Sequence, residues 1–293
     1  MAFFGEEVAS TASNCEGADL LRALAGEPAD RYLAEFYMPA MANAVGLETP
    51  ALDQLKTALS DQEMAFRAFL ANYAATRRSP AREQIAPVFL HALDLTLGGN
   101  DFAEYLESHD AEALWLSFDE AWTERTGKSA APLRPVLEGT AELVFEIFET
   151  HGHGNVFRWA CDEIARSRRV EAVFLRLKAI RTLGPKTASH FLRDTVILYD
   201  LEDDVDYADR IYLQPISSVV RRLAARIVPE AAGKRLPDWV LAGKMSKQAR
   251  LAGVSGVRFN IGCAYLGLRL ALRSGGVERA VEDLLRASGT DEE

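Results

Sequence analysis

The spacing of apolar positions along this chain is helical from one end to the other. Apolar residues recur every three or four positions, and the period-2 alternation of β-branched residues that is typical of strands is almost absent. We therefore expect an all-α protein. The pattern predicts helices over residues 17–45, 51–75, 81–97, 101–107, 111–125 and 135–150. Glycine and proline occupy the breaks between these segments, as helix ends require.

The second half of the chain continues the same pattern in shorter segments. A Pro/Gly/Lys-rich connector is predicted over residues 229–246. The predicted helices before it are VFRWACDEIAR, VEAVFLRLKAIRTL, TASHFLRDTVIL and SSVVRRLAARIV, and those after it are SKQARLAG, FNIGCAYLGLRLALR and VERAVEDLLRAS.

The stretch AIRTLGPKTASHFLRD, residues 179–194, joins two of these helices by a very short turn. Gly184 supplies backbone freedom, and Pro185 suits the first position of the second helix. The first N–H groups of that helix, near Lys186, lack intrahelical partners, and the helix dipole favours an anion beside them. A DNA phosphate would meet this requirement without a broadly basic surface.

The segment LGPKTASHFL resembles the helix-hairpin-helix of the base-excision DNA glycosylase superfamily, whose pattern is close to L-P-G-h-G-x-K-T-A. The matching positions are Ile180, Leu183, Gly184, Lys186, Thr187 and Ala188, and Thr182 replaces the first glycine of the hairpin. In the bifunctional members of that superfamily the lysine is the nucleophile, so the resemblance assigns that role to Lys186. It implies an attack on the sugar C1′ of a flipped-out nucleotide, with release of the base and formation of a Schiff base.

A second segment, YLQPISSVVRRLAARI at 212–227, is similar to the form LQPIDxWVRR of archaeal 8-oxoguanine glycosylase-like relatives. These relatives have a long loop between the lysine and the catalytic aspartate, and here Ser217 lies 31 positions after Lys186. Ser217 stands at the aspartate position. A serine can cap the helix as well as an aspartate does, but it cannot stabilise a cationic sugar in the transition state. The later segment GVSGVRFNIGCAYLGLRL also resembles the last helix of such proteins.

The resemblance covers residues 140–275 and implies a helix-hairpin-helix glycosylase-like module over 101–293, with the hairpin at 170–198. Residues 1–100 form an extra N-terminal helical region. The implied partner is duplex DNA with a modified base, and 8-oxoguanine is the substrate suggested by the family. The implied DNA-binding residues are Thr182, Gly184, Lys186, Thr187, Ser217, Arg221 and Arg222.

The acidic loop LEDDVDYADR contains carboxylates that could replace the absent aspartate. Asp204 lies 18 positions after Lys186, near the spacing of family members with a short loop, and Asp206 or Asp209 could equally approach the site. We take Asp204 and Asp206 as candidate catalytic residues beside Lys186. The alternative is an acidic loop that is simply solvated.

Three residues before the hairpin are candidates for a base pocket, because loops between these helices border the pocket in similar glycosylases. They are His151, Phe157 and Trp159. The alternatives are an ordinary turn for the histidine and core packing for the aromatic side chains. His151 and His153 have no cysteine or carboxylate partner at a metal-ligand spacing, so we expect no metal and no cofactor.

Charge and composition narrow the classes of function. A net charge of −10 and a pI of about 5.2 argue against binding nucleic acid by bulk charge. Arginines and lysines nevertheless cluster at 166–169, 221–226 and 234–250, which favours a local basic face on an acidic protein. The three separated cysteines exclude a disulfide framework, and no secretory or membrane-spanning pattern is found. We expect a cytoplasmic, nucleoid-associated monomer.

Two other functions remain open. Ser217 favours a degenerate relative that binds DNA or a modified base without cleaving it. The acidic pI and Thr182 favour an N-glycosidase that acts on a modified nucleoside or nucleotide.

Overall fold

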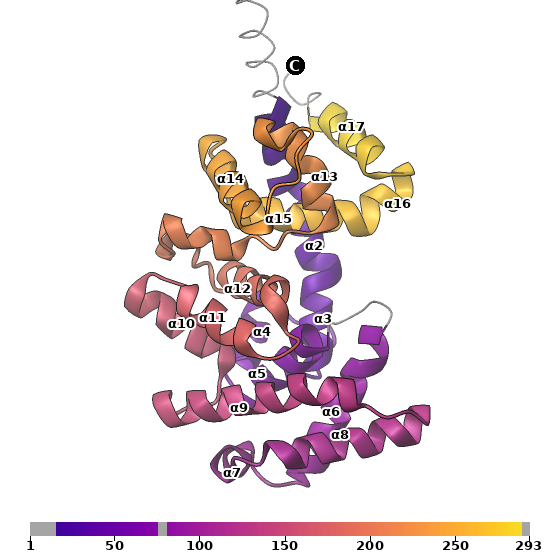
Figure 1. The fold of residues 1–293 in the computed structure, drawn as a ribbon, viewed down its shortest axis with the longest axis vertical. Helices are drawn as coiled ribbons and strands as arrows, with labels where there is room; N and C mark the ends of the chain where they lie inside the picture. Colours follow the sequence, from indigo (N-terminus) through magenta and orange to yellow (C-terminus); the bar gives the residue numbers. More distant parts are fainter. Residues whose placement is uncertain (1–15, 76–80, 289–293) are drawn as a thin grey trace, which may run out of the picture. The chain divides into compact units, whose positions relative to one another are not determined.

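The computed structural model describes residues 16–75 and 81–288, and throughout these ranges the regular structure is helical, without a β-strand. The prediction of an all-α protein is confirmed. Figure 1 shows helices of one to five turns joined by short connections. Most helix ends lie within one or two residues of the predicted ones, because glycine, proline and capping side chains mark them in the sequence.

The chain divides into two compact units. We call residues 38–204 the central unit, and residues 1–37 together with 205–293 the terminal unit. The first helical residues that the structure describes, from residue 16 on, therefore fold with residues 205–288. Residue 100, the expected end of an N-terminal region, lies inside the central unit.

The central unit contains the predicted hairpin. Its elements are α3 (Met38–Ala44), α4 (Leu52–Ala58), α5 (Gln62–Phe69), η2 (Leu70–Ala74), α6 (Ala81–Leu97), α7 (Phe102–Ser108), α8 (Ala111–Thr126), η3 (Ala131–Leu133), α9 (Arg134–His151), α10 (Val156–Ser167), α11 (Glu171–Ala179), α12 (Gly184–Tyr199) and η4 (Glu202–Asp204). The expectation of one helical stretch over 51–75 is wrong in one detail. The stretch breaks after α4, and Asp61 begins α5 by accepting a hydrogen bond from the Met64 N–H at 2.9 Å.

An aromatic cluster holds α12 in the core of the central unit. The Phe191 ring of α12 has its centroid 5.2 Å from those of Phe69 and Tyr73 and 5.1 Å from that of Phe157. These rings come from α5, η2 and α10, so three elements fix the second helix of the hairpin. Tilted and edge-on ring pairs of this kind add about 0.5–1.5 kcal/mol each beyond the area that they bury.

The terminal unit is built from both ends of the chain. Residues 16–25 are helical, and the further elements are α2 (Glu27–Tyr32), η1 (Leu33–Tyr37), η5 (Tyr207–Leu213), α13 (Ser218–Ile227), η6 (Pro229–Ala231), α14 (Asp238–Leu251), α15 (Gly256–Tyr265), η7 (Leu266–Leu270), α16 (Ala271–Ser274) and α17 (Val277–Ser288). The predicted connector over 229–246 is too long, because α14 already begins at Asp238. The core unites Leu20 and Leu24 with Leu223, Met245 and Phe259.

Gly262 and Arg258 explain how the two ends of the chain join in this unit. A β-carbon on Gly262 would lie 1.9 Å from the Leu24 carbonyl oxygen, so only glycine permits this approach of the two helices. Arg258 donates to the Ala25 carbonyl at 2.8 Å and pairs with Asp30 at 2.7 Å. The helix over residues 16–25 therefore packs closely against α15. The ion pair of Arg258 with Asp30 of α2 adds a charge-assisted hydrogen bond to this contact.

Candidate functional site at the helical hairpin

The hairpin between α11 and α12 closes through a four-residue turn. The Leu183 N–H donates to the Ile180 carbonyl oxygen at 3.1 Å, and Thr182, the third residue of the turn, has a φ of 83°. A type II turn has this φ at its third residue, where glycine is usual. Thr182 therefore adopts a backbone conformation in which glycine is usual, although a β-branched residue rarely does so. Gly184 follows with a φ of 62°.

The first turn of α12 presents backbone donors and a cation together. Leu183 occupies the N-cap position and supplies no capping side chain, Pro185 is at the start of the helix, and the first turn contains no acidic residue. Lys186 is exposed and Thr187 is half-buried. Since α12 is 16 residues long, its dipole places partial positive charge at this end. The arrangement attracts an anion.

His190 lies one helical turn after Lys186 and is half-buried. Burial lowers its pKa well below the ordinary value, and the positive charges of Arg193 and Lys186 lower it further. A neutral imidazole therefore lies beside the lysine at neutral pH. Sequence reasoning passed over His190, although its spacing of four from Lys186 places both on one helix face.

Beneath this face, α12 carries a buried ion pair. Arg193 is 1% exposed, and its Nη2 and Nε lie 2.6 and 2.9 Å from the Oδ1 of Asp194. The Tyr73 hydroxyl donates to the Oδ2 of Asp194 at 3.2 Å. Asp194 therefore neutralises a buried cation, and its hydrogen bond with Tyr73 fixes α12 against η2.

No described carboxylate of the central unit lies within ion-pair distance of Lys186. Asp204 belongs to this unit and is exposed in η4, next to Asp203, whose carbonyl oxygen accepts from Arg168 at 2.9 Å. Asp206 and Asp209 belong to the terminal unit, where Asp206 is exposed and Asp209 is 3% exposed.

Ser217 caps α13 in the terminal unit. Its Oγ accepts a hydrogen bond from the Val220 N–H at 3.1 Å, which confirms the capping role expected for it. The segment just before it is held by Asn260 of α15, which donates to the Gln214 side chain at 3.2 Å and to the Pro215 carbonyl at 3.3 Å. The two segments that resemble the glycosylase pattern in this unit are therefore in contact.

The two arginines of α13 are in different environments. Arg221 donates to the Leu236 carbonyl at 2.9 Å and pairs with Asp238, so it ties α13 to the start of α14. Arg222 is exposed. Of the predicted DNA-binding residues, Thr182, Gly184, Lys186 and Thr187 are brought together in the central unit, whereas Ser217, Arg221 and Arg222 belong to the terminal unit.

The three predicted base-pocket residues lie in different environments. Phe157 is fully buried in the aromatic cluster, and Trp159 is 8% exposed in α10. Base stacking on Phe157 would require this core to open, so the environment observed is that of core packing. His151 is exposed at the end of α9, with its ring centroid 5.9 Å from that of His153.

His153 belongs to a structural junction beside His151. Its Nδ1 accepts from the Asn155 N–H at 3.3 Å, and its Nε2 lies 3.4 Å from Asp162. Asn155 in turn donates to the carbonyl oxygens of Leu59 and Ser60. In the part of the chain that the structure describes, no group of three or more His, Cys, Asp or Glu side chains is arranged to hold a metal ion.

Comparison with family models, with curated proteins and with solved structures found no match to this chain. No helix between residues 16 and 288 that the structure describes is both long and apolar enough to cross a membrane.

Proposed function

We propose that this protein binds DNA through the α11–α12 hairpin, recognises a modified base and cleaves its N-glycosidic bond, with Lys186 as the nucleophile. The observation that carries the proposal is the backbone of the hairpin. Thr182 and Gly184 have φ values of 83° and 62°, and the turn leads into an uncapped helix whose first turn exposes Lys186.

Phosphate binding and the chemical step would both take place at the N-terminal end of α12. A phosphate bound at the α12 N-terminus would accept hydrogen bonds from backbone N–H groups and benefit from the dipole. The neighbouring Lys186 would then face the sugar of a nucleotide turned out of the duplex. In the proposed reaction its neutral amine attacks C1′, the bond from C1′ to the base nitrogen breaks, and the base leaves with a proton. The Lys186 nitrogen then forms an imine with C1′ of the opened sugar.

A lysine nucleophile must lose its proton before it attacks. His190 lies on the same helix face and is neutral at physiological pH, so it adds no further positive charge beside the lysine, although its low pKa makes it a weak proton acceptor. Arg193 adds positive charge one turn further on, although Asp194 pairs with it.

Ser217 favours a second candidate, a relative that binds DNA and has lost the chemistry. Its side chain is engaged in capping α13 and carries no charge, so it offers no stabilisation to a cationic sugar. If the chain is catalytic, Asp204, which belongs to the same unit as Lys186, would supply this charge.

The test is base release from a panel of duplexes that carry 8-oxoguanine, uracil, hypoxanthine or an alkylated purine, with mass spectrometry of the released base. We expect one base to be released by the wild type and none by Lys186→Arg, which keeps the cation and cannot act as a nucleophile. Lys178→Arg, at an exposed lysine of α11, is the matched control and should remain active. Duplex binding without release from any substrate would support the degenerate binder. Cleavage of free nucleosides without duplex binding would support the nucleosidase.

A further inference from the structure

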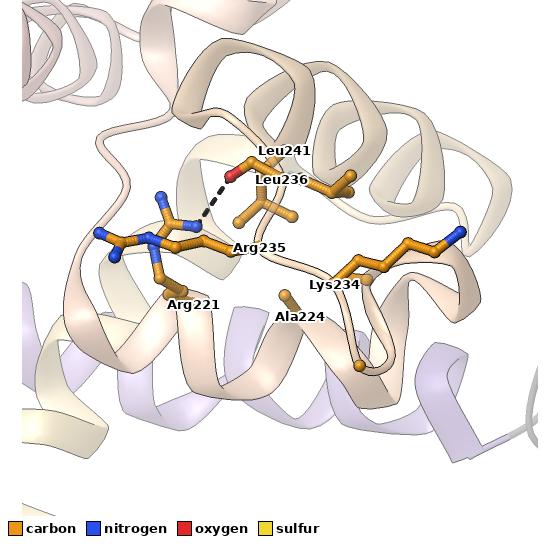
Figure 2. A pocket seen from close by; sticks show the side chains of 8 residues that line it. Arg221, Ala224, Lys234, Arg235, Leu236 and Leu241 are labelled. Carbon is orange, nitrogen blue, oxygen red and sulfur yellow. Dashed lines mark hydrogen bonds between the residues drawn. The ribbon is translucent and has the colours of Figure 1, made fainter.

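A pocket with a volume of about 320 Å³ lies in the terminal unit, between α13, the segment after η6 and α14 (Figure 2). Its cationic lining residues are Arg221, Lys234 and Arg235. Its floor is apolar, and consists of Ala224, Ala231, Leu236 and Leu241. The size is within the usual range for small-molecule sites.

One of the three cations is held in place by the fold. Arg221 donates to the Leu236 carbonyl at the wall of the pocket (Figure 2). It also pairs with Asp238, and the two bonds fix its guanidinium. Figure 2 shows the Arg235 side chain extending to the same side as Arg221, with Lys234 on the other side. Positive groups thus flank the opening from two sides.

The other two cations have no anionic partner in the described structure. Lys234 and Arg235 are exposed and form no ion pair with a described residue, whereas the neighbouring Glu230 is bound to Lys244 at 2.7 Å. Between residues 218 and 250 the chain carries eight lysines and arginines and only two acidic residues, Glu230 and Asp238. This local excess of positive charge attracts an anion, although the chain as a whole has a net charge of −10.

We propose that this pocket binds a phosphate group attached to a sugar, with the phosphate between Arg221 and Arg235 and the sugar on the apolar floor. Arginine forks match phosphate oxygens, and the CH groups of a sugar suit Leu236 and Leu241. The site lies outside the hairpin and does not depend on the proposed glycosidic chemistry. The phosphate can come from a DNA strand or from a free nucleotide, and the experiment distinguishes the two sources.

The experiment measures the affinity of the full chain for two probes, thymidine 5′-monophosphate and a fluorescently labelled DNA duplex, at several salt concentrations. The test variant is Lys234→Gln/Arg235→Gln, because these exposed side chains form no ion pair within the described structure. Arg279→Gln, at an exposed arginine of α17 in the same unit, is the matched control.

We expect the double variant to weaken binding at least about tenfold for the probe that the site uses, with the control unchanged. If the source is DNA, the slope of log affinity against log salt should also fall by roughly 0.9 for each phosphate that the two side chains neutralise in the wild type. A weaker affinity for thymidine monophosphate alone would assign the site to a free nucleotide. Equal affinity of the double variant and the wild type for both probes, or no binding of either probe by the wild type, would overturn the proposal. Absence of base release with phosphate binding intact would contradict only the proposed function.

Discussion

The side chains of Asn260 and Gln214, 46 positions apart in the chain, form a hydrogen bond of 3.2 Å in the core of the terminal unit. Asn260 is 2% exposed and Gln214 is 4% exposed. Since Asn260 also donates to the Pro215 carbonyl, one amide group fixes the backbone that leads into Ser217 and α13. The position of Ser217 therefore depends on a residue of α15.

We predict that Asn260→Ala lowers the free energy of unfolding by about 1–3 kcal/mol, because it leaves buried acceptors without a donor. Chemical denaturation measures the change. Asn100→Ala, at an exposed position, is the control and should leave stability unchanged. An Asn260→Ala protein as stable as the wild type would contradict the role assigned to this amide.

Thr182 and Gly184 should respond to substitution in opposite directions. Thr182→Gly relieves a positive φ and is expected to raise the free energy of unfolding by up to about 1 kcal/mol. Gly184→Ala should lower it by about 1–2 kcal/mol, although the added β-carbon would meet no atom within 4 Å, because the backbone conformation itself disfavours alanine. Thermal unfolding of both variants checks the pair, and a stabilising Gly184→Ala would show that the turn has a different backbone.

The Arg193–Asp194 pair should be strongly coupled. Arg193→Met leaves the Asp194 carboxylate buried beside the Tyr73 hydroxyl, and we expect it to cost about 3–5 kcal/mol of stability. The double variant Arg193→Met/Asp194→Leu removes both charges and should cost less than the two single variants together. A double-mutant cycle by urea denaturation measures the coupling, and strictly additive costs would contradict it.

Stability should fall as the pH drops below about 6.5, the ordinary histidine pKa. Burial lowers the pKa of His153, and the positive charge of Arg158 acts in the same direction, whereas the hydrogen bond and the negative charge of Asp162 oppose the shift without cancelling it. The unfolded chain therefore binds a proton more readily than the folded one. The stabilising contribution is present above the unfolded pKa and is lost progressively as the pH falls through the lower folded pKa.

His190 also lowers stability as the pH falls, because burial and nearby positive charge lower its pKa in the folded chain. Denaturation at pH 5 and pH 7 should show a smaller loss of stability for His153→Gln than for the wild type. His91→Gln, at an exposed position on α6, serves as the control. An unchanged pH dependence in His153→Gln would exclude His153 as a source of the effect.

Local features of the sequence predicted much of the fold. Glycine and proline located the helix ends, and the Ser217 cap and the Gly184–Pro185 start of α12 were foreseen because capping acts over a few residues. Periodicity did not reveal the break at Asp61 or the early start of α14 at Asp238, since both adjoin stretches that keep a helical pattern.

Contacts between distant segments could not be predicted. The residues around Gly262 and Arg258 give no sign that these two positions contact Leu24 and Ala25. The sequence around Asn260 likewise does not indicate its hydrogen bond with Gln214. Phe157 illustrates the same limit at the site. An aromatic residue beside a hairpin is compatible with a base pocket or a core, and in the structure the rings of Tyr73 and Phe191 pack against Phe157 in the core.

The most direct measurement of the central claim is borohydride trapping on a duplex with an abasic site, followed by peptide mapping. Reduction of the imine would leave a stable covalent bond between the sugar and the nucleophile. We predict an adduct on the peptide that contains Lys186, absent in Lys186→Arg and present in Lys178→Arg. An adduct on another lysine, or no adduct although the duplex is bound, would contradict Lys186 as the nucleophile.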